Sequence, residues 1–546
     1  MSRRPLVLTV SLVATASCSH APPPRTATVV QQGAHVDPGV GINAADLRRD
    51  LFIFASDSFR GRETGTADAQ RAAAFIARRA QQLGLEPAGD SLYLQRVPLA
   101  RQVLTPATRI AVVTSNGRQQ TLRLGADVVP MLAFGEAGAE TKRNVEGEII
   151  YVGYGPTDDD ESAALARFDL AGKVLVAIHG APPKVKPDVA NKFESRRALG
   201  ERMARLMALH PAAIVMLMAG GAEQLYEQTA PRFLRSVVFD RGTVSLDDSS
   251  ADSLRTLPTM LLGVARRGSW LLPARWPNDA APQALGRELH VHIDVERQPF
   301  TGYNVAAVLR GSDPRLNKTY LAFGAHYDHL GVIAPPRSGR RRSRSDSIAN
   351  GANDDGSGSM ALLAVARDMS YLRPRRSVLF VWHIGEEKGL LGSSYFTAHP
   401  TVPIDSIVAE FNADAIAGSS DAVSLIGPRA APNYLSWRVG IIVDSANRAL
   451  PTPLKIDRQW DDPDDPDDAF ARGDHINYAR RGIPVIFFSS PRNAEYHSVS
   501  DEADKIDYDK LAHIAQLMSE SGFAVANRSS RPTSEVLTQS IGSRQP

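Results

Sequence analysis

The stretch FGAHYDHLG, residues 323–331, places His326, Asp328 and His329 within four residues. The chain has only 13 histidines, so two of them this close together suggest a chemical role. Four further segments also carry imidazole or carboxylate groups, each after an apolar run or in a glycine-rich turn. These groups are Asp354 and Asp355, Glu386 and Glu387, Asp414, and Tyr496 with His497. Zinc binds histidine nitrogen and carboxylate oxygen, so the five segments together predict a metal site.

The chemistry that fits these groups is a pair of divalent metal ions. Two metals ~3.5–4 Å apart can share a bridging carboxylate and activate a bridging water, which requires about five ligands. A further carboxylate must then act as general base. Neighbouring residues at the end of a strand point in different directions, so one of Glu386 and Glu387 can bind metal while the other faces the water. Asp328 can hold the second ring nitrogen of His326 and fix its tautomer.

The elements that must position these groups alternate between strands and helices from about residue 289 onward. Strand patterns cover residues 303–311, 319–325, 377–384, 406–414 and 484–489, and residues 357–372 have a helical pattern. Near-continuous apolar strands that alternate with helices predict a sheet covered on both faces. Sheets of this kind bind ligands at the carboxyl ends of their strands, where the acids and histidines fall. The predicted fold class is α/β, with a mixed, mostly parallel sheet flanked by helices.

Six blocks of this region resemble peptidase family M28, a family of zinc aminopeptidases. They are GAHYDHLG, NGANDDGSG, GEEKGLLGS, FNADAIAG, GDHINYARRGIPVIFF and YHSVSDEADKI, and they follow the family's order between about residues 304 and 508. The loop PPRSGRRRSRSDSIAN departs from the family pattern, because it is inserted between the first two ligands. The resemblance implies a zinc-peptidase fold and hydrolysis of peptides.

The resemblance also implies two zinc ions per chain, held by five ligands. The ligands are His326 and Asp414 at one zinc, Glu387 and His497 at the other, and Asp354 as the bridge between them. Glu386 would be the general base, and Tyr496 would donate to the tetrahedral oxyanion. Asp355 is an alternative to Asp354 as the bridge. Asp474 and His475 match another recurrent block, and their role stays open.

The chain before the catalytic blocks divides into further segments. Residues 43–144, with LFIFASDSFRGRETGT and a helical pattern that ends at LGLEP, resemble the N-terminal segment of the family. Residues 145–264 resemble a protease-associated (PA) domain through GEIIYVGYG, FDLAGKVLVAIHG and LPTMLLG. We therefore predict an inserted β-rich PA-like domain at 145–264, the catalytic domain at 265–527 and a disordered tail at 528–546.

The N-terminus has the pattern of an export signal. Arg3 and Arg4 precede an apolar run that is too short to span a bilayer of ~30 Å, and small residues lead to Cys18. We interpret residues 1–18 as a lipoprotein signal with a lipid on Cys18. A discarded signal in which Cys18 is incidental, or a twin-arginine signal, is the alternative. Residues 19–42 form a Pro-rich linker. Each interpretation places the mature protein outside the cytoplasm, in the bacterial cell envelope, periplasmic or extracellular.

The composition bounds the remaining possibilities. With 546 residues the chain is too long for one core, and its 43% apolar and 22% charged residues are typical of globular proteins. A net charge of +2 gives no global field that favours nucleic acid. Two charged runs, Arg340–Arg344 and Asp461–Asp468, are predicted to be solvated surface loops. His329 is predicted to be a loop residue or a contact of a ligand, and His383 a core residue.

These observations predict an exported dizinc aminopeptidase that hydrolyses N-terminal residues from peptides. Its association with the membrane would occur only through the lipid anchor at Cys18. The alternatives on the same fold are a carboxypeptidase, a dipeptidase or a glutaminyl cyclase, and the cyclase would need a single zinc. A non-catalytic binding ectodomain is a further alternative, although none of the five ligands is missing.

Overall fold

A computed structural model describes residues 41–532 with short gaps. The gaps are 133–140, 167, 224–225, 227–229, 231–232, 241–257, 278–280, 334–345, 431–435 and 491–494. The predicted export signal, the linker up to residue 40, the run Arg340–Arg344 and residues 533–546 of the tail lie outside the described residues. None of the described helices is long and apolar enough to cross a bilayer.

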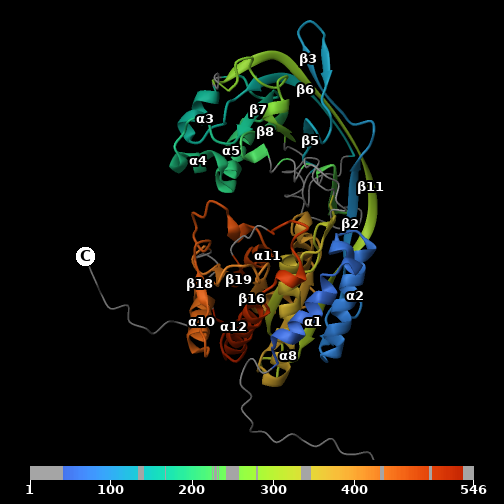
Figure 1. Ribbon diagram of the computed structural model, residues 1–546, viewed down its shortest axis with the longest axis vertical. Helices are drawn as coiled ribbons and strands as arrows, with labels where there is room; N and C mark the ends of the chain where they lie inside the picture. Colours follow the sequence, from blue (N-terminus) through green and yellow to red (C-terminus); the bar gives the residue numbers. More distant parts are fainter. Residues whose placement is uncertain are drawn as a thin grey trace, which may run out of the picture. The chain divides into compact units, whose positions relative to one another are not determined.

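The first sheet contains the strands predicted from the C-terminal half of the chain (Figure 1). Its strands, from one edge to the other, are β9 (Arg235–Phe239), β2 (Leu94–Leu104), β11 (Gln283–Leu309), β15 (Ser377–His383), β12 (Tyr320–His326), β16 (Ile407–Ala413), β19 (Val485–Ser489), β17 (Ala422–Ile426) and β18 (Lys455–Asp457). The four neighbours β15, β12, β16 and β19 are parallel. The short strand β1 (Glu86–Pro87) also pairs with β11.

Helices cover both faces of the first sheet because its inner strands are apolar on both sides. Alternate residues of β12 point to opposite faces, so Leu321 and Phe323 join one core while Ala322 joins another. The first face is covered by α1 (Ala44–Phe54), α2 (Ala67–Gln82), α8 (Gly358–Leu372), α10 (Ser436–Ala449) and α12 (Tyr508–Ala526), which Figure 1 shows beside the sheet. The helices α9 (Leu391–Ala398) and α11 (His475–Ala479) pack on the other face. The predicted layered α/β fold is therefore observed.

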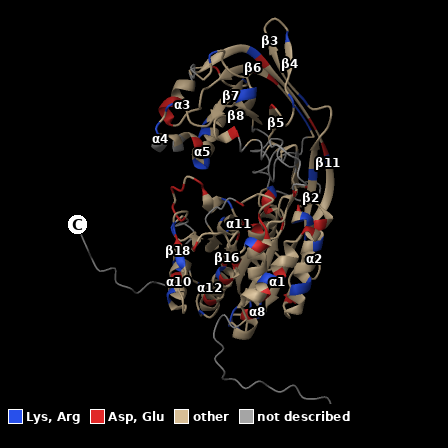
Figure 2. Ribbon diagram, viewed as in Figure 1, with Lys and Arg blue, Asp and Glu red and all other residues tan. Residues whose placement is uncertain are grey.

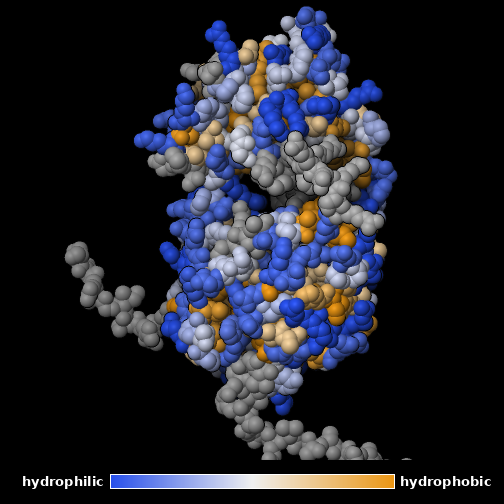
Figure 3. Space-filling view, viewed as in Figure 1, coloured by the Kyte–Doolittle hydropathy of each residue, from blue (hydrophilic) through white to orange (hydrophobic). Residues whose placement is uncertain are grey.

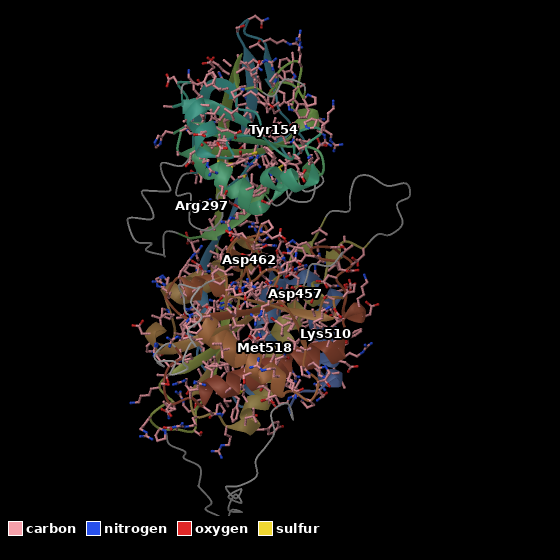
Figure 4. The ribbon with its side chains drawn as sticks, turned by 90° about the vertical axis from the view of Figure 1, so that its left-hand side faces the viewer. Tyr154, Arg297, Asp457, Asp462, Lys510 and Met518 are labelled. Atoms are coloured by element: carbon pink, nitrogen blue, oxygen red, sulfur yellow. The ribbon has the colours of Figure 1, made fainter. Side chains whose placement is uncertain are left out.

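The helix α12 ties the C-terminal end of the described chain to the loop after β16. Asp507 caps its first turn by accepting a hydrogen bond from the Lys510 backbone N–H. The Lys510 ammonium donates to the carbonyl of Gly418 at 2.8 Å, and Met518, two turns further along, is fully buried. Figure 4 labels Lys510 and Met518 on this helix. A polar residue of α12 thus contacts the loop after β16, and an apolar residue packs in the core.

A second sheet gathers the β-rich runs of the inserted region. Its order is β4 (Gln119–Thr121), β3 (Arg109–Thr114), β11, β6 (Lys142–Tyr151), β7 (Val174–His179), β8 (Ala213–Met218), β10 (Thr259–Val264) and β5 (Val128–Pro130). This sheet has its own buried clusters and carries α3 (Asp159–Ala166), α4 (Pro187–Glu194) and α5 (Arg196–Met207). Its strands reach beyond the predicted segment 145–264 at both ends. β3, β4 and β5 precede this segment, and β11 follows it. The 27 residues of β11 pair first in the second sheet and then in the first.

The described surface is polar with scattered apolar residues. Basic and acidic residues both occur on α1 and α2 (Figure 2). Hydrophilic residues cover most of the visible face in Figure 3, and apolar residues occur between them. Large exposed apolar side chains among the described residues are few, for example Ile53 and Tyr371.

Candidate metal centre

The carboxyl ends of the parallel strands deliver the predicted ligands to one edge of the first sheet. In register, His326 at the end of β12 pairs with His383 at the end of β15. Glu386 and Glu387 follow β15 in a single 3-10 turn, and Asp414 is the first residue after β16. Asp354 lies in the turn before α8, and Tyr496 and His497 follow β19. Residues separated by up to 171 positions thus meet at the edge where such sheets bind ligands.

The two carboxylate oxygens of Asp354 face two different histidines. Oδ1 lies 3.2 Å from Nε2 of His326, and Oδ2 lies 3.1 Å from Nε2 of His497. The Asp414 carboxylate lies 3.4 Å from the same nitrogen of His326, and Oε2 of Glu387 lies 3.2 Å from Nε2 of His497. Two groups of donors therefore share Asp354, which is the arrangement that a carboxylate bridge between two metals requires.

The donor set fits a pair of metal ions in composition and in burial. His326 is fully buried, yet its Nε2 forms no hydrogen bond of standard geometry with a described residue. Donor atoms of His326, Asp354 and Asp414 lie within 4.8 Å of one another. Buried polar atoms that lack hydrogen bonds need another partner. Imidazole nitrogens and carboxylate oxygens that converge in this way match the preferences of zinc.

Asp355 is engaged by the backbone and faces away from the second histidine. Its Oδ1 accepts from the N–H groups of Gly358 at 2.9 Å and Ala415 at 3.2 Å, and its Oδ2 accepts from the His326 N–H. These three bonds join the loops that carry ligands. The geometry therefore favours Asp354 as the bridge and gives its neighbour a supporting role.

Glu386 occupies the position expected of a general base. Its Oε2 lies 3.9 Å from Nε2 of His326, and it lines the same cleft as Asp354 and Asp414. Burial raises the pKa of Glu386 well above its ordinary value, and Asp414, Glu387 and Asp474 raise it further. A carboxylate with a raised pKa accepts and returns a proton near neutral pH more readily than an exposed one.

The carboxylate of Asp328 does not hold the second ring nitrogen of His326, contrary to the prediction. His326 Nδ1 lies 3.0 Å from the backbone carbonyl oxygen of Asp328 and 3.7 Å from its carboxylate. The carboxylate instead accepts from the N–H groups of Gly385 at 2.9 Å and Glu386 at 3.2 Å. Asp328 thus fixes the imidazole through its main chain and the turn of the glutamate pair through its side chain.

The electrostatics of the centre reflect crowded carboxylates. Burial opposes the charged form of His326, but Asp414 and Glu386 raise its pKa well above the ordinary value. Burial likewise opposes the charged form of His497, and Glu387 with Asp354 raises its pKa to about 9. Burial also raises the pKa of Asp414. This concentration of negative charge attracts cations, and two dications would neutralise it.

A cleft that opens to solvent lies above the centre. Trp460, Ala469 and Phe487 give it an apolar wall, and Arg472 and Tyr496 add polar groups. Arg472 donates to the Tyr496 hydroxyl at 3.3 Å, and the tyrosine ring stacks on His497 with centroids 3.9 Å apart. Burial raises the pKa of Tyr496, so its hydroxyl stays protonated and able to donate.

Several other predicted residues also have defined places. His383 is fully buried beside Phe396, as predicted for a core residue. The run Asp461–Asp468 is not simply a surface loop: Asp461 is fully buried, and its carboxylate accepts from three backbone N–H groups at 427, 429 and 430. Asp474 is buried and accepts from Ser393 Oγ at 2.5 Å, and burial raises its pKa to about 7. His475 stacks on Phe487 and so supports the apolar wall.

Sequence reasoning missed Arg62 and Thr64, which hold the ligand loops from outside. Arg62 is fully buried and donates to the carbonyls of Tyr327, Asn350 and Gly351 at 2.6–2.8 Å. Thr64 donates to Oδ2 of Asp328 at 2.6 Å. His329, predicted as a loop residue or a contact of a ligand, is fully buried, with Nδ1 2.8 Å from Oε1 of Glu387. The one sequence signal for the first two was the stretch RGRET within the N-terminal block.

Comparisons with known proteins agree with this geometry. Residues 304–521 match the model of peptidase family M28. A probable leucine aminopeptidase of Trichophyton verrucosum (strain HKI 0517) is 25% identical over 287 residues, which are 50% of this chain and 72% of that protein. An aminopeptidase from Aneurinibacillus sp. strain AM-1 superposes with a TM-score of 0.55 at 17% identity, over 90% of this chain and 96% of that one. BSAP, a zinc aminopeptidase from Bacillus subtilis, superposes with a TM-score of 0.50 at 16% identity, over 90% and 97%.

The fold and the donor set together define a peptidase of the α/β class. Residues 304–521 are the part of the chain that matches peptidase family M28. The predicted family, the predicted fold class and the predicted class of enzyme are thereby confirmed.

Proposed function

We propose that the protein is an exported dizinc aminopeptidase that removes N-terminal residues from peptides. The observation that carries this proposal is that the two oxygens of Asp354 contact two different histidines, His326 and His497. Asp414 lies beside the first histidine and Glu387 beside the second. One zinc would be held by His326, Asp414 and Asp354, and the other by Glu387, His497 and Asp354. The zinc ions would lower the pKa of a shared water and polarise the scissile carbonyl.

The side chains of the centre supply the proton transfers of the reaction. Glu386 takes a proton from the attacking water, whose oxygen forms a bond to the carbonyl carbon. The Tyr496 hydroxyl donates to the oxyanion that develops on the former carbonyl oxygen. The C–N bond then breaks, and Glu386 returns the proton to the leaving amine. Asp328 keeps Glu386 in place through the backbone N–H groups that it accepts from.

The cleft favours an apolar residue at the N-terminus of the substrate. Trp460, Ala469 and Phe487 form a wall that can remove an aliphatic side chain from water. The carboxylates of Glu386 and Asp414 line the same cleft and can accept from a free α-amino group. Relatives named as leucine aminopeptidases support this substrate class.

The remaining predictions about the whole chain belong to the same proposal. The mature protein is exported to the bacterial cell envelope, held by a lipid on Cys18, and acts on peptides outside the cytoplasm. The inserted region is a PA-like domain without catalytic groups. The N-terminal pattern of charged, apolar and small residues supports export, and the separate cores of the second sheet support the inserted domain.

The proposal is tested by substituting the general base. Glu386→Gln keeps the size of the side chain but cannot accept the proton, so turnover should fall by roughly 10²–10⁴-fold. Two metals should still bind, because Glu386 is not a ligand. Hydrolysis of aminoacyl anilides with free and with blocked amines measures activity, and metal analysis of the same samples measures occupancy. Glu86→Gln, in an exposed ion pair with Arg310, is the matched control and should keep wild-type turnover.

Each outcome distinguishes a different function. Cleavage of free-amine substrates alone, lost in Glu386→Gln, establishes an aminopeptidase. Near-normal turnover of Glu386→Gln contradicts the assigned base. A single zinc in the wild-type protein favours a glutaminyl cyclase, and cleavage of carboxy-terminal substrates favours a carboxypeptidase. Folded protein with neither metal nor hydrolysis would be a binding ectodomain.

A further inference from the structure

The imidazole of His329 lies inside the centre, beside Glu387. The side chain is fully buried, and neither ring nitrogen forms a hydrogen bond of standard geometry with a described residue. Its nearest polar contact is Oε1 of Glu387, at 2.8 Å from Nδ1, and Oδ1 of Asp354 follows at 3.9 Å. A buried imidazole without ordinary partners is costly, so the contact with Glu387 needs an explanation.

The chain makes room for this ring at a specific glycine. Gly351 has a left-handed backbone with φ of +58°, which glycine adopts without strain. A Cβ at Gly351 would lie 2.5 Å from Cγ and Cδ2 of His329 and 2.3 Å from the carbonyl oxygen of Asp354. The turn that presents Asp354 therefore also admits the histidine. An alanine at residue 351 would therefore not be compatible with the observed packing.

The two oxygens of Glu387 have different partners. Oε1 faces His329, whereas Oε2 lies 3.2 Å from Nε2 of His497, the histidine that Oδ2 of Asp354 also approaches. His329 thus approaches Oε1 of Glu387, and Oε2 faces the second group of donors. A carboxylate ligand is oriented in this way when a donor holds the oxygen that does not face the metal.

We propose that His329 is a positioning residue whose Nδ1–H holds Oε1 of Glu387, so that Oε2 points to the second metal. This inference rests on the dizinc centre proposed above. Donor atoms of His329, Asp354 and Glu387 lie within 4.8 Å of one another, so direct ligation by Nδ1 is the alternative. We favour positioning, because Nδ1 approaches Oε1 of Glu387 and Oδ1 of Asp354, whereas His497 approaches Oε2 and Oδ2. Burial opposes the charged form of Glu387, but His497 and then His329 lower its pKa well below the ordinary value.

The test compares two replacements of the histidine by cobalt binding to the metal-free protein. His329→Leu removes the donor and keeps an apolar volume, whereas His329→Asn places an amide N–H near the former Nδ1. In the wild-type protein two Co²⁺ ions should bind, and His497→Ala identifies the event that belongs to the second site. His329→Leu should weaken that event by roughly 10–100-fold, and His329→Asn should restore most of the affinity. The visible spectrum at saturating Co²⁺ should stay unchanged in His329→Leu, because no ligand is lost.

The control is His383→Asn, which removes another fully buried imidazole close to the sheet edge. Both affinities and the spectrum should then match the wild type. Equal affinities in His329→Leu and wild type would overturn the inference, and so would a changed cobalt spectrum in both His329 variants, which would make Nδ1 a ligand. Failure of the wild-type protein to bind two metals would instead overturn the proposed function, so the two failures are separable.

Discussion

At the scale of single residues, the geometry of the centre depends on which partner each carboxylate oxygen contacts. The two oxygens of Asp354 contact two different histidines. Asp328 accepts hydrogen bonds from a backbone turn and from Thr64. The two oxygens of Glu387 contact His497 and His329. The sequence could supply the residue types, because imidazole and carboxylate after apolar strands indicate zinc. The sequence could not show which partner each carboxylate oxygen contacts. Asp354 and Asp355, for example, are the same residue type and differ only in the direction in which the backbone points their side chains.

Metal binding at the second site should release a proton from His497. In the metal-free protein the neighbouring carboxylates hold the pKa of His497 at about 9, so the ring is protonated at pH 7. A histidine ligand must be neutral, and the apparent affinity for zinc should therefore rise with pH up to about 9 and then level off. Calorimetric titration in two buffers of different ionisation enthalpy measures the released protons. An enthalpy at neutral pH that does not depend on the buffer would contradict the assignment.

Removing the Tyr496 hydroxyl should lower kcat while both metals stay bound. The hydroxyl is protonated and accepts from Arg472, and we expect it to donate its proton to an oxyanion in the cleft. Loss of one such donor costs roughly 10²–10³-fold in kcat in other acyl-transfer sites. The measurement is steady-state hydrolysis by Tyr496→Phe with metal analysis, and Tyr371→Phe at an exposed position of α8 is the control. A change confined to KM would assign the hydroxyl to substrate binding instead.

At the scale of elements, the ligand loops are joined by a short N-terminal segment, residues 62–64. Its backbone enters through left-handed conformations at Arg60, Gly61 and Arg62. A Cβ at Gly61 would lie 2.3 Å from the carbonyl oxygen of Ala349, so this turn requires glycine. Sequence patterns predicted β12, β15, β16 and β19 well, because inner strands are continuously apolar. They could not reveal a contact between residues 62 and 327, since it depends on carbonyl groups that carry no sequence signature.

Thr64→Val should reduce kcat through Asp328 and leave the fold intact. The valine keeps the shape but removes the donor to Oδ2 of Asp328, which costs about 1–3 kcal/mol for a buried unpaired acceptor. The carboxylate that holds the Glu386 turn then loses one of its fixed partners, so kcat should fall by about tenfold and Thr64→Ser should recover it.

The matched control for this prediction is Thr66→Val, two residues further along. Thr66 caps α2 by accepting from the Ala69 N–H, so its loss should lower thermal stability by about 1 kcal/mol without changing kcat. Activity, melting temperature and the pH profile of kcat are measured on all three variants. If Thr64→Val and Thr66→Val had equal effects on kcat and on stability, Thr64 would have only a structural role, and its predicted effect on kcat through Asp328 would be wrong.

At the scale of the whole molecule, β11 belongs to both sheets and lies outside the predicted segment 145–264. A pattern of apolar runs indicated strands, but one strand of 27 residues that serves two sheets has no separate signal for its midpoint. The buried clusters show that the two parts of β11 belong to different cores. Leu289 and Val291 pack in the second sheet with Ile110 and Val112. Val305 and Ala307 pack in the first sheet. Two cores of this kind allow the two regions to respond differently to solution conditions.

Acid should destabilise the second sheet through His179 at the end of β7. Burial, with the nearby charge of Arg202, lowers the pKa of His179 from 6.5 to about 4. The buried guanidinium lies 3.1 Å from Nδ1, so the ring must be neutral to accept its hydrogen bond. The folded state binds fewer protons than the unfolded state, and the stabilisation present above pH 6.5 is lost as pH falls toward about 4, by up to about 3 kcal/mol.

His179→Gln tests this acid sensitivity, because the glutamine oxygen can accept from Arg202 but does not titrate. Its melting temperature should fall less than that of the wild type between pH 7.5 and pH 4.5, as measured by calorimetry with zinc absent in both samples so that the metal centre contributes equally. His210→Asn, at an exposed position just after α5, is the control and should follow the wild type. A parallel loss of stability in His179→Gln and wild type would show that acid acts through other groups, most directly through the carboxylates of the metal centre.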